Sequence, residues 1–249
     1  MKFLVLFISL LVTTAQATDI EKEQRWAEQV VDFLIDGEAI WLNDNGHEFL
    51  GIYTESEDES NKAIIVVHGT GVHPDWEQVV KPVRVEMAAH GWNTLSIQMP
   101  ILVNEAEYED YVAVYPEVPG RFNTSITHLQ ELGMTEIVIV GHSQGATMGS
   151  YYLSRNTHSI KAFVAVGMQA TQKDLELNTA ESLKSIDIPV LDLYGSEDLE
   201  GVLQTAEERK QAASNNTQYK QMVTEGAEHF YDGYEETLID SINNWLMSL

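Results

Sequence analysis

Residues 137–149 read IVIVGHSQGATMG, and this stretch decides the fold. Four β-branched residues, 137–140, run directly into GHSQG at 141–145, and small residues that suit a packed helix follow. A strand, a tight G-x-S-x-G turn and a helix make up a nucleophile elbow, from which a serine hydroxyl projects. The alternative is a glycine-rich turn with a solvated serine. The elbow interpretation requires catalytic partners for Ser143 elsewhere in the chain.

The pattern around this stretch predicts a single α/β domain over residues 18–249. Runs rich in Val, Ile and Leu alternate with helical segments, which is typical of a mostly parallel sheet covered by helices on both faces. Before them, one segment has helical spacing and the next carries two short apolar runs around Asn-Asp-Asn-Gly, which predicts an edge hairpin. We expect helices at 19–36, 76–89, 119–132, 143–154, 203–214 and 234–246, the hairpin at 39–53, and strands at 63–67, 93–97, 136–140, 161–166, 189–194 and 218–223.

Four predicted strands are followed by residues that carry chemistry. Open α/β sheets hold their sites beyond the carboxyl ends of the strands. HGTG at 68–71 follows one strand, and Ser143, Asp198 and His229 follow three others. The order Ser, Asp, His along the chain is that of α/β-hydrolases and differs from the chymotrypsin and subtilisin orders. Ser143 therefore has partners in the right places.

Each of these residue types matches a step of acyl transfer. A neutral serine hydroxyl is a poor nucleophile, so a base must take its proton. His229 can accept that proton and return it to the leaving group, while Asp198 would fix the imidazole tautomer and stabilise the imidazolium. Backbone N–H groups must stabilise the charge on the tetrahedral intermediate. We expect Thr70 and Gln144 to supply them.

Neighbouring residues compete for these roles. Asp192 alternates within a buried run and should face the sheet, and Glu197 lies one residue short of the G-x-x-D spacing, so Asp198 is preferred as the acid. His142 is interpreted as a residue that packs beside the elbow. His68, His73 and Asp75 could be metal ligands, but a His-Gly turn after a strand suits an oxyanion turn better. We therefore predict no metal and no cofactor.

The N-terminus and the composition limit the location and the partners. Residues 1–17, MKFLVLFISLLVTTAQA, have the basic start, short apolar run and A-x-A end of a signal peptide, and the run is too short to span a bilayer. We expect cleavage after Ala17 and export to the periplasm or beyond. A net charge of −25 offers no basic patch for nucleic acid or anionic lipid. Without cysteines, disulfides and thiolate sites are excluded.

From about residue 45 onward the chain resembles the α/β-hydrolase superfamily. HGTG at 68–71, GHSQG at 141–145, GSED at 195–198 and AEH at 227–229 carry the resemblance. HGTGVHPDW, HGWNTLSIQMP and PGRF resemble, more narrowly, an exported Gram-negative family of α/β-hydrolase-like proteins of unknown function. The resemblance implies Ser143 as nucleophile, Asp198 as acid, His229 as base, and Thr70 with Gln144 as oxyanion donors.

We therefore expect a serine hydrolase that cleaves an ester or similar acyl bond of a small molecule through an acyl-enzyme. A peptidase or amidase with the same triad, and a non-catalytic binding protein on this fold, remain open. About 22 residues separate the strands at 161–166 and 189–194, which leaves almost no room for a cap domain. The irregular stretch 100–118 is either a solvated loop or a partial lid whose Tyr108, Tyr111 and Tyr115 line the acyl pocket. Limited cover predicts a preference for short neutral or cationic acyl groups.

Overall fold

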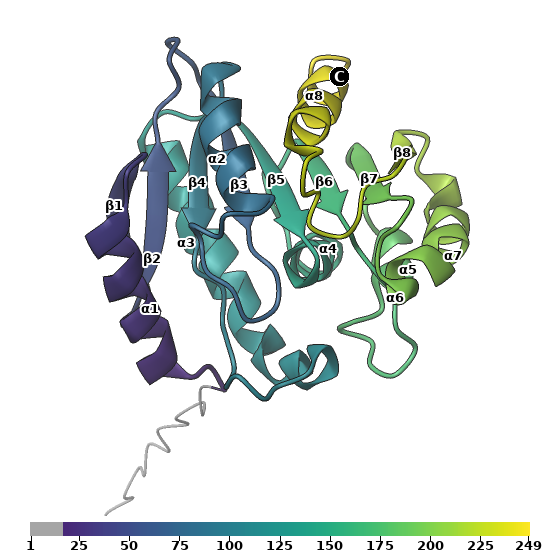
Figure 1. Cartoon of the computed structure of the whole chain (residues 1–249), viewed down its shortest axis with the longest axis horizontal. Helices are drawn as coiled ribbons and strands as arrows, with labels where there is room; N and C mark the ends of the chain where they lie inside the picture. The colour runs from purple at the N-terminus through teal and green to yellow at the C-terminus, as the bar shows by residue number, and fades with distance from the viewer. Residues whose placement is uncertain (1–16) are drawn as a thin grey trace, which may run out of the picture.

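The computed structural model describes residues 17–249, and the predicted signal peptide lies almost entirely outside them. The strands form one eight-stranded sheet in the order β1-β2-β4-β3-β5-β6-β7-β8 (Figure 1). β1 pairs with β2, and β2 with β4, in antiparallel fashion, and every pair from β4 to β8 is parallel. The predicted mostly parallel sheet is confirmed. The strands are β1 (Glu38–Asp44), β2 (His47–Thr54), β3 (Lys62–Val67), β4 (Asn93–Ile97), β5 (Glu136–His142), β6 (Ala162–Val166), β7 (Val190–Gly195) and β8 (Tyr219–Thr224).

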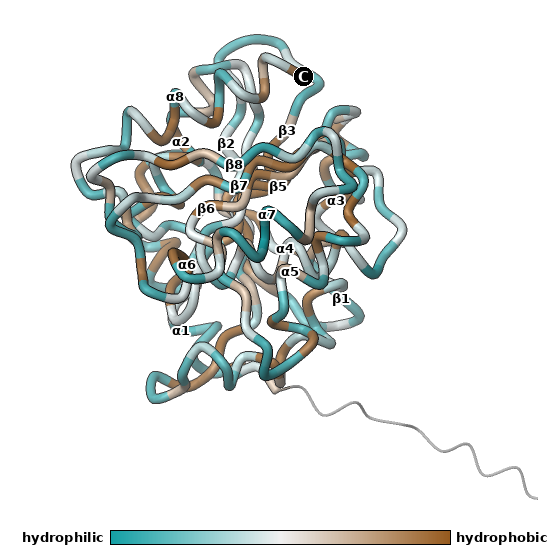
Figure 2. Tube along the Cα trace, turned by 90° about the vertical axis from the view of Figure 1, so that its right-hand side faces the viewer, coloured by the Kyte–Doolittle hydropathy of each residue, from teal (hydrophilic) through white to brown (hydrophobic). Residues whose placement is uncertain are grey.

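Helices cover both faces of this sheet, so its apolar strands are enclosed, as the brown strands in Figure 2 show. α2 (Val80–Ala89) and α8 (Glu235–Leu246) pack on one face. α3 (Val118–Glu131), α4 (Gln144–Arg155) and α5 (Thr179–Leu183) pack on the other. The remaining helices are α1 (Ile20–Phe33), which packs on β2, and η1 (Tyr108–Glu117), α6 (Glu200–Gln204), α7 (Ala206–Ala212) and η2 (Ala213–Asn215). Within residues 17–249, no helix has the length and apolarity needed to cross a membrane.

The stretch 100–118 differs from the irregular segment expected from the sequence. Its second half forms the 3-10 helix η1, which begins with a capping box between Glu107 and Asp110. Tyr111, Val114 and Tyr115 are buried on one side of it. Their spacing is that of an amphipathic helix, but acidic residues and Pro116 interrupt the pattern and hide it in the sequence. The prediction of a wholly irregular stretch was therefore wrong.

Two predicted helices also differ in extent. The helix expected from residue 76 begins only at Val80, because Val79 has a positive φ of 60° and no helix can include such a backbone. The helix expected at 203–214 is divided into α6, α7 and η2. The short helix α5 lies in the segment between β6 and β7, so this segment holds no more than one helical turn or so and no cap domain.

Parallel strands all end at the same edge of the sheet, which is the lower edge in Figure 1. The turn after β3, the elbow after β5, and the loops after β7 and β8 therefore meet there. This arrangement brings residues that are far apart in the sequence into one site.

Candidate active site

Ser143 occupies a strained turn between β5 and α4. Its φ of 54° and ψ of −121° lie outside the regions that non-glycine residues normally adopt, and such strain concentrates at functional sites. Its N–H donates to the Val166 carbonyl at 2.8 Å. A Cβ at Gly145 would lie 2.4 Å from the Val67 carbonyl oxygen, so only glycine lets α4 approach the end of β3 this closely. The strand–turn–helix geometry expected of a nucleophile elbow is present.

His229 and Asp198 form a buried pair. The His229 Nδ1 atom lies 2.6 Å from Asp198 Oδ1, and both side chains are about 5% exposed or less. The carboxylate also accepts from the N–H groups of Leu199, at 2.7 Å, and Gly195, at 3.3 Å. With Nδ1–H donating to the carboxylate, Nε2 is left as the proton acceptor. Glu197 is exposed and makes no such contact, so the structure pairs Asp198 with His229.

Gly167, which the sequence analysis did not single out, makes room for this pair. It follows β6 with a φ of +61°, and a Cβ there would lie 2.9 Å from His229 Cε1 and 3.5 Å from Asp198 Oδ2. A side chain at this position would therefore displace the imidazole. The signal in the sequence was its place directly after a buried strand, at the edge where the site lies.

His142 packs beside the elbow, as expected, and supports His229 through the backbone. Its Nε2 lies 3.0 Å from the His229 carbonyl oxygen, and the two rings are 4.8 Å apart. Burial lowers the pKa of His142 to about 3, so the neutral ring donates its Nε2–H to that carbonyl. This bond fixes the chain that carries the candidate base.

The three residues considered as metal ligands have other partners. His73 Nδ1 accepts from Asp75 N–H at 3.3 Å. His68 Nδ1 lies 2.9 Å from the Gly69 carbonyl, and its Nε2 accepts from Met99 N–H at 2.9 Å. Burial lowers the pKa of His68 to about 3, so the ring is neutral. Asp75 forms an ion pair with Arg84 instead. Among residues 17–249, no three His, Cys, Asp or Glu side chains form a group that could hold a metal ion.

A pocket of about 260 Å³ contains Ser143, His229 and Thr70. We call it the catalytic pocket. Several of its lining residues had not been singled out for the site: Val72, Trp76, Gln169, Leu199, Val202 and Phe230. Most of these side chains are apolar, and they come singly from separate segments, so the sequence gives no signal for such a wall. The pocket therefore suits a small neutral group beside the serine.

Of the two expected oxyanion donors, Gln144 lies in the elbow directly after Ser143, and Thr70 lies in the turn after β3. Gln144 is the first residue of α4, where the N–H has no partner within the helix. Within the described chain, no backbone carbonyl accepts from Thr70 N–H. Both N–H groups are thus free to donate to a bound oxygen atom.

Of the three tyrosines proposed to line the pocket, Tyr108 does so, and its hydroxyl lies 2.8 Å from Thr147 Oγ1. Tyr111 and Tyr115 are buried behind it. The Tyr111 hydroxyl accepts from Gly71 N–H at 3.1 Å, and the Tyr115 hydroxyl accepts from Gln144 Nε2 at 2.8 Å. These two tyrosines support the turns that carry the expected oxyanion donors and are not part of the pocket wall.

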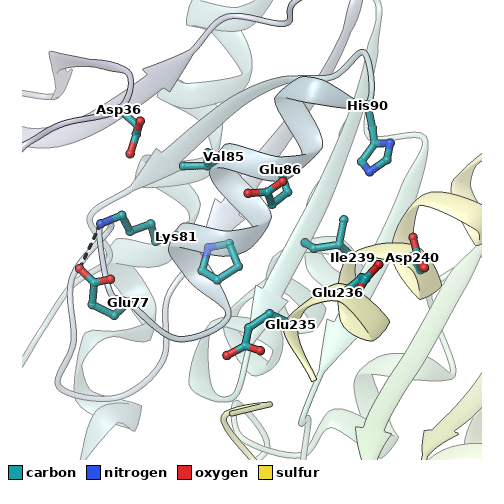
Figure 3. A pocket seen from close by; sticks show the side chains of 11 residues that line it. Asp36, Glu77, Lys81, Val85, Glu86, His90, Glu235, Glu236, Ile239 and Asp240 are labelled. Carbon is teal, nitrogen blue, oxygen red and sulfur yellow. Dashed lines mark hydrogen bonds and ion pairs between the residues drawn. The ribbon is translucent and has the colours of Figure 1, made fainter. Parts of the chain in front are cut away.

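A larger hollow than the catalytic pocket lies elsewhere in the described chain. It encloses about 750 Å³ between α2 and α8, and Figure 3 shows carboxylates from both helices around it. Its one lysine, Lys81, pairs with Glu77 at 3.1 Å. None of the predicted catalytic residues lines this acidic groove. The volume of a hollow therefore does not by itself identify the candidate active site.

Comparisons with known proteins show the family and the fold of the chain. The chain belongs to the family described as "Protein of unknown function (DUF3530)", whose model matches residues 12–119 and 103–248. No curated protein matches the sequence.

Solved structures with similar folds are α/β hydrolases. Est1E from Butyrivibrio proteoclasticus is 14% identical with a TM-score of 0.66, over 84% of this chain and 98% of that one. The Pyrococcus furiosus esterase Pf2001 is 17% identical with a TM-score of 0.69, over 88% and 95%. A putative dienelactone hydrolase from Klebsiella pneumoniae is 16% identical with a TM-score of 0.69, over 85% and 98%. The chain therefore has the α/β-hydrolase fold.

Proposed function

We propose that this protein is a serine hydrolase that cleaves a carboxylic ester of a small molecule. The observation that carries the proposal is the His229–Asp198 pair, which shares one pocket with a serine in a strained elbow. The similar folds of an esterase from Pyrococcus furiosus and of Est1E support an ester as the substrate. A binding protein would not require a strained serine in the same pocket as a histidine that a carboxylate orients.

The reaction follows from the roles of these groups. Ser143 Oγ attacks the ester carbonyl carbon, and its proton passes to His229 Nε2. The N–H groups of Thr70 and Gln144 donate to the oxyanion. The intermediate collapses with cleavage of the C–O bond, and His229 gives its proton to the departing alkoxide. Water then attacks the acyl-enzyme, again through His229, and releases the acid and free serine.

The size of the catalytic pocket sets the expected acyl group. About 260 Å³ is below the range of pockets that enclose drug-sized ligands. Tyr108 at its wall is neutral, since burial raises its pKa to about 12. We expect short neutral or cationic acyl groups, turnover that falls from acetyl to palmitoyl esters, and no jump in rate above the micellar concentration.

We also propose that the chain is exported and begins at Thr18 after processing. Thr18 is buried, its N atom lies 3.2 Å from Glu117 Oε1, and its hydroxyl donates to Oε2 at 2.7 Å. A new α-ammonium group at Thr18 would therefore meet a carboxylate. Mass spectrometry of the exported protein tests this, and a chain that retains residues 1–17 in the membrane fraction would contradict it.

The test of the activity is Ser143→Ala, assayed with p-nitrophenyl acetate and with a fluorophosphonate probe. We expect a loss of several orders of magnitude in kcat, no labelling, and an unchanged folded structure by circular dichroism. Aminoacyl p-nitroanilides in parallel separate an amidase from an esterase. A variant that keeps most of its activity would exclude Ser143 as the nucleophile.

A further inference from the structure

A second hollow adjoins the catalytic pocket. We call it the α1 groove: it lies between α1 with Ile35 on one side and the loop at 73–77 on the other, and it encloses about 620 Å³. Trp76 lines both the α1 groove and the catalytic pocket. The two hollows therefore share a wall within reach of the elbow.

The α1 groove exposes apolar surface that the fold does not use. Ile35 and Phe33 are 85% and 80% exposed, which makes them the most exposed large apolar side chains of the described chain. Both line the α1 groove, together with Trp26 and Val30. Contiguous exposed apolar side chains mark binding surfaces, whereas single ones do not.

A row of aromatic rings leads from α1 to the shared wall. The Trp26 and His73 ring centroids are 5.9 Å apart, and those of His73 and Trp76 are 5.5 Å apart, both edge to face. Burial lowers the pKa of His73, so the ring between the two indoles is neutral. The row offers a continuous aromatic surface up to the wall shared with the catalytic pocket. Lys22 Nζ lies 4.5 Å from the Trp26 ring centroid.

Buried Arg84 holds the two sides of the α1 groove together. Its Nη2 donates to Asp75 at 2.5 Å, and its Nη1 donates to the Asp36 carbonyl at 2.7 Å. The cation that lines the groove, Lys81, pairs with Glu77 at 3.1 Å. Because Arg84 and Lys81 each pair with a carboxylate, neither is free to attract an anionic ligand, and the exposed apolar side chains favour a neutral apolar one.

The position of Trp76 indicates which arm of an ester would lie here. Its Nε1 donates to Gln78 Oε1 at 3.1 Å, and Gln78 Nε2 donates to Asp232 at 3.0 Å. Asp232 belongs to the loop that carries His229, the group that must protonate the leaving oxygen. Trp76 is thus linked by hydrogen bonds to the loop of the expected proton donor to the leaving group, which favours the α1 groove for the leaving-group arm.

We propose that the α1 groove binds the apolar alcohol arm of a neutral ester, with the small acyl arm in the catalytic pocket. This inference rests on the proposed esterase function, since it assigns the two arms of that substrate. It predicts a substrate that is short on the acyl side and long or bulky on the alcohol side.

The test is a series of acetate esters, ethyl to octyl, assayed below their solubility limits. Each methylene that enters the α1 groove should raise kcat/KM by up to about fourfold. The double variant Phe33→Ser, Ile35→Ser should remove most of this rise and leave ethyl acetate turnover unchanged. Met247→Ser is the matched control, because Met247 is 77% exposed and lines neither hollow.

The outcomes separate this inference from the proposed function. Ser143-dependent hydrolysis with no dependence on alcohol length, or with the same dependence in the double variant, overturns the groove assignment and leaves the esterase standing. A wild-type dimer that becomes a monomer in the double variant makes the α1 groove an interface between two copies, which also overturns it.

If the protein hydrolyses no ester, the proposed function is excluded. A binding experiment then tests the α1 groove separately. We would add 1-hexanol to Ser143→Ala and follow the indole N–H resonances, assigned with Trp26→Phe and Trp76→Phe. Shifts at Trp26 and Trp76 that vanish in the double variant support an apolar alcohol site. No shift at either indole overturns it.

Discussion

Asp192 lies in β7 and Asp198 in the loop directly after it, yet the two carboxylates have different partners. Asp192 is fully buried and accepts from Arg209 Nε at 2.8 Å, Tyr219 Oη at 2.7 Å and Gln221 Nε2 at 3.1 Å. Its partners carry a permanent charge or stay neutral. Asp198 instead accepts from His229, whose ring lines the catalytic pocket.

The difference shows how one residue type supports structure in one place and chemistry in another. A buried carboxylate whose oxygens are all bound by arginine and other donors has no proton to transfer and no contact with a pocket. A carboxylate beside histidine orients a ring whose second nitrogen faces a cavity. Burial is shared by both, so the partner and the access to a pocket decide the role.

The largest expected effect separates the two aspartates by activity. Asp198→Asn should lower kcat by about 10⁴-fold, because an amide cannot hold the imidazole in the required tautomer, while the unfolding midpoint changes little. Glu197→Gln is the matched control, since its side chain is exposed and next in sequence. Steady-state hydrolysis of p-nitrophenyl acetate measures both variants. A greater loss at Glu197 would move the acid to that position.

Asp192→Ala should show the reverse pattern, with a large loss of stability and little loss of turnover. Removing one partner of a buried ion pair leaves Arg209 uncompensated and costs about 3–5 kcal/mol of unfolding free energy. Urea denaturation measures this loss, and kcat at low temperature reports on the folded fraction. The comparison breaks down if Asp192→Ala remains as stable as the wild type.

Gly167→Ala tests whether His229 must stay where it is. The new Cβ would approach the imidazole, and a displacement of about 1 Å can cost roughly 10²-fold in rate. Gly133→Ala is the control, because Gly133 also has a positive φ, of 89°, but has nothing within 4 Å of such a Cβ. Similar activity loss in the two variants would point to backbone strain alone.

The smallest effect is an acid sensitivity located in the Asp198 region. The pKa of His142 is lowered to about 3 in the folded state, against about 6.5 in the unfolded chain. Below pH 6.5 the unfolded state therefore binds a proton that the folded state does not. This contribution to stability is complete above pH 6.5 and is lost as the pH falls toward 3.

The check is the urea midpoint of the wild type and His142→Asn between pH 7 and pH 5. The wild-type midpoint should fall more steeply with decreasing pH than that of the variant. Tyr219→Phe, in the Asp192 region, should keep the wild-type slope, because burial raises the pKa of Tyr219 and the hydroxyl stays neutral throughout. Equal slopes in wild type and His142→Asn would contradict the assignment.

Much of the fold could be predicted because it depends on local patterns. The strands predicted from the buried runs 63–67 and 93–97 match the bounds of β3 and β4 to within one residue. The Asn45-Gly46 turn takes the two positive φ values, 51° and 96°, that this dipeptide allows in a hairpin. The helix η1 was missed. Its buried residues have helical spacing, but acidic residues and a proline, which are typical of loops, lie between and beside them.

Part of the candidate site could likewise be predicted from local patterns, and part could not. Motif order alone placed Ser143, Asp198 and His229 at strand ends, since parallel strands bring such ends to one edge and local turn chemistry marks them in the sequence. Only the tertiary structure distinguished Tyr108 at the pocket wall from Tyr111 and Tyr115 behind it. It alone placed Trp76 between two hollows and Gly167 against the imidazole. These positions depend on how distant segments pack, and packing leaves no periodic signal in the chain that could be read beforehand.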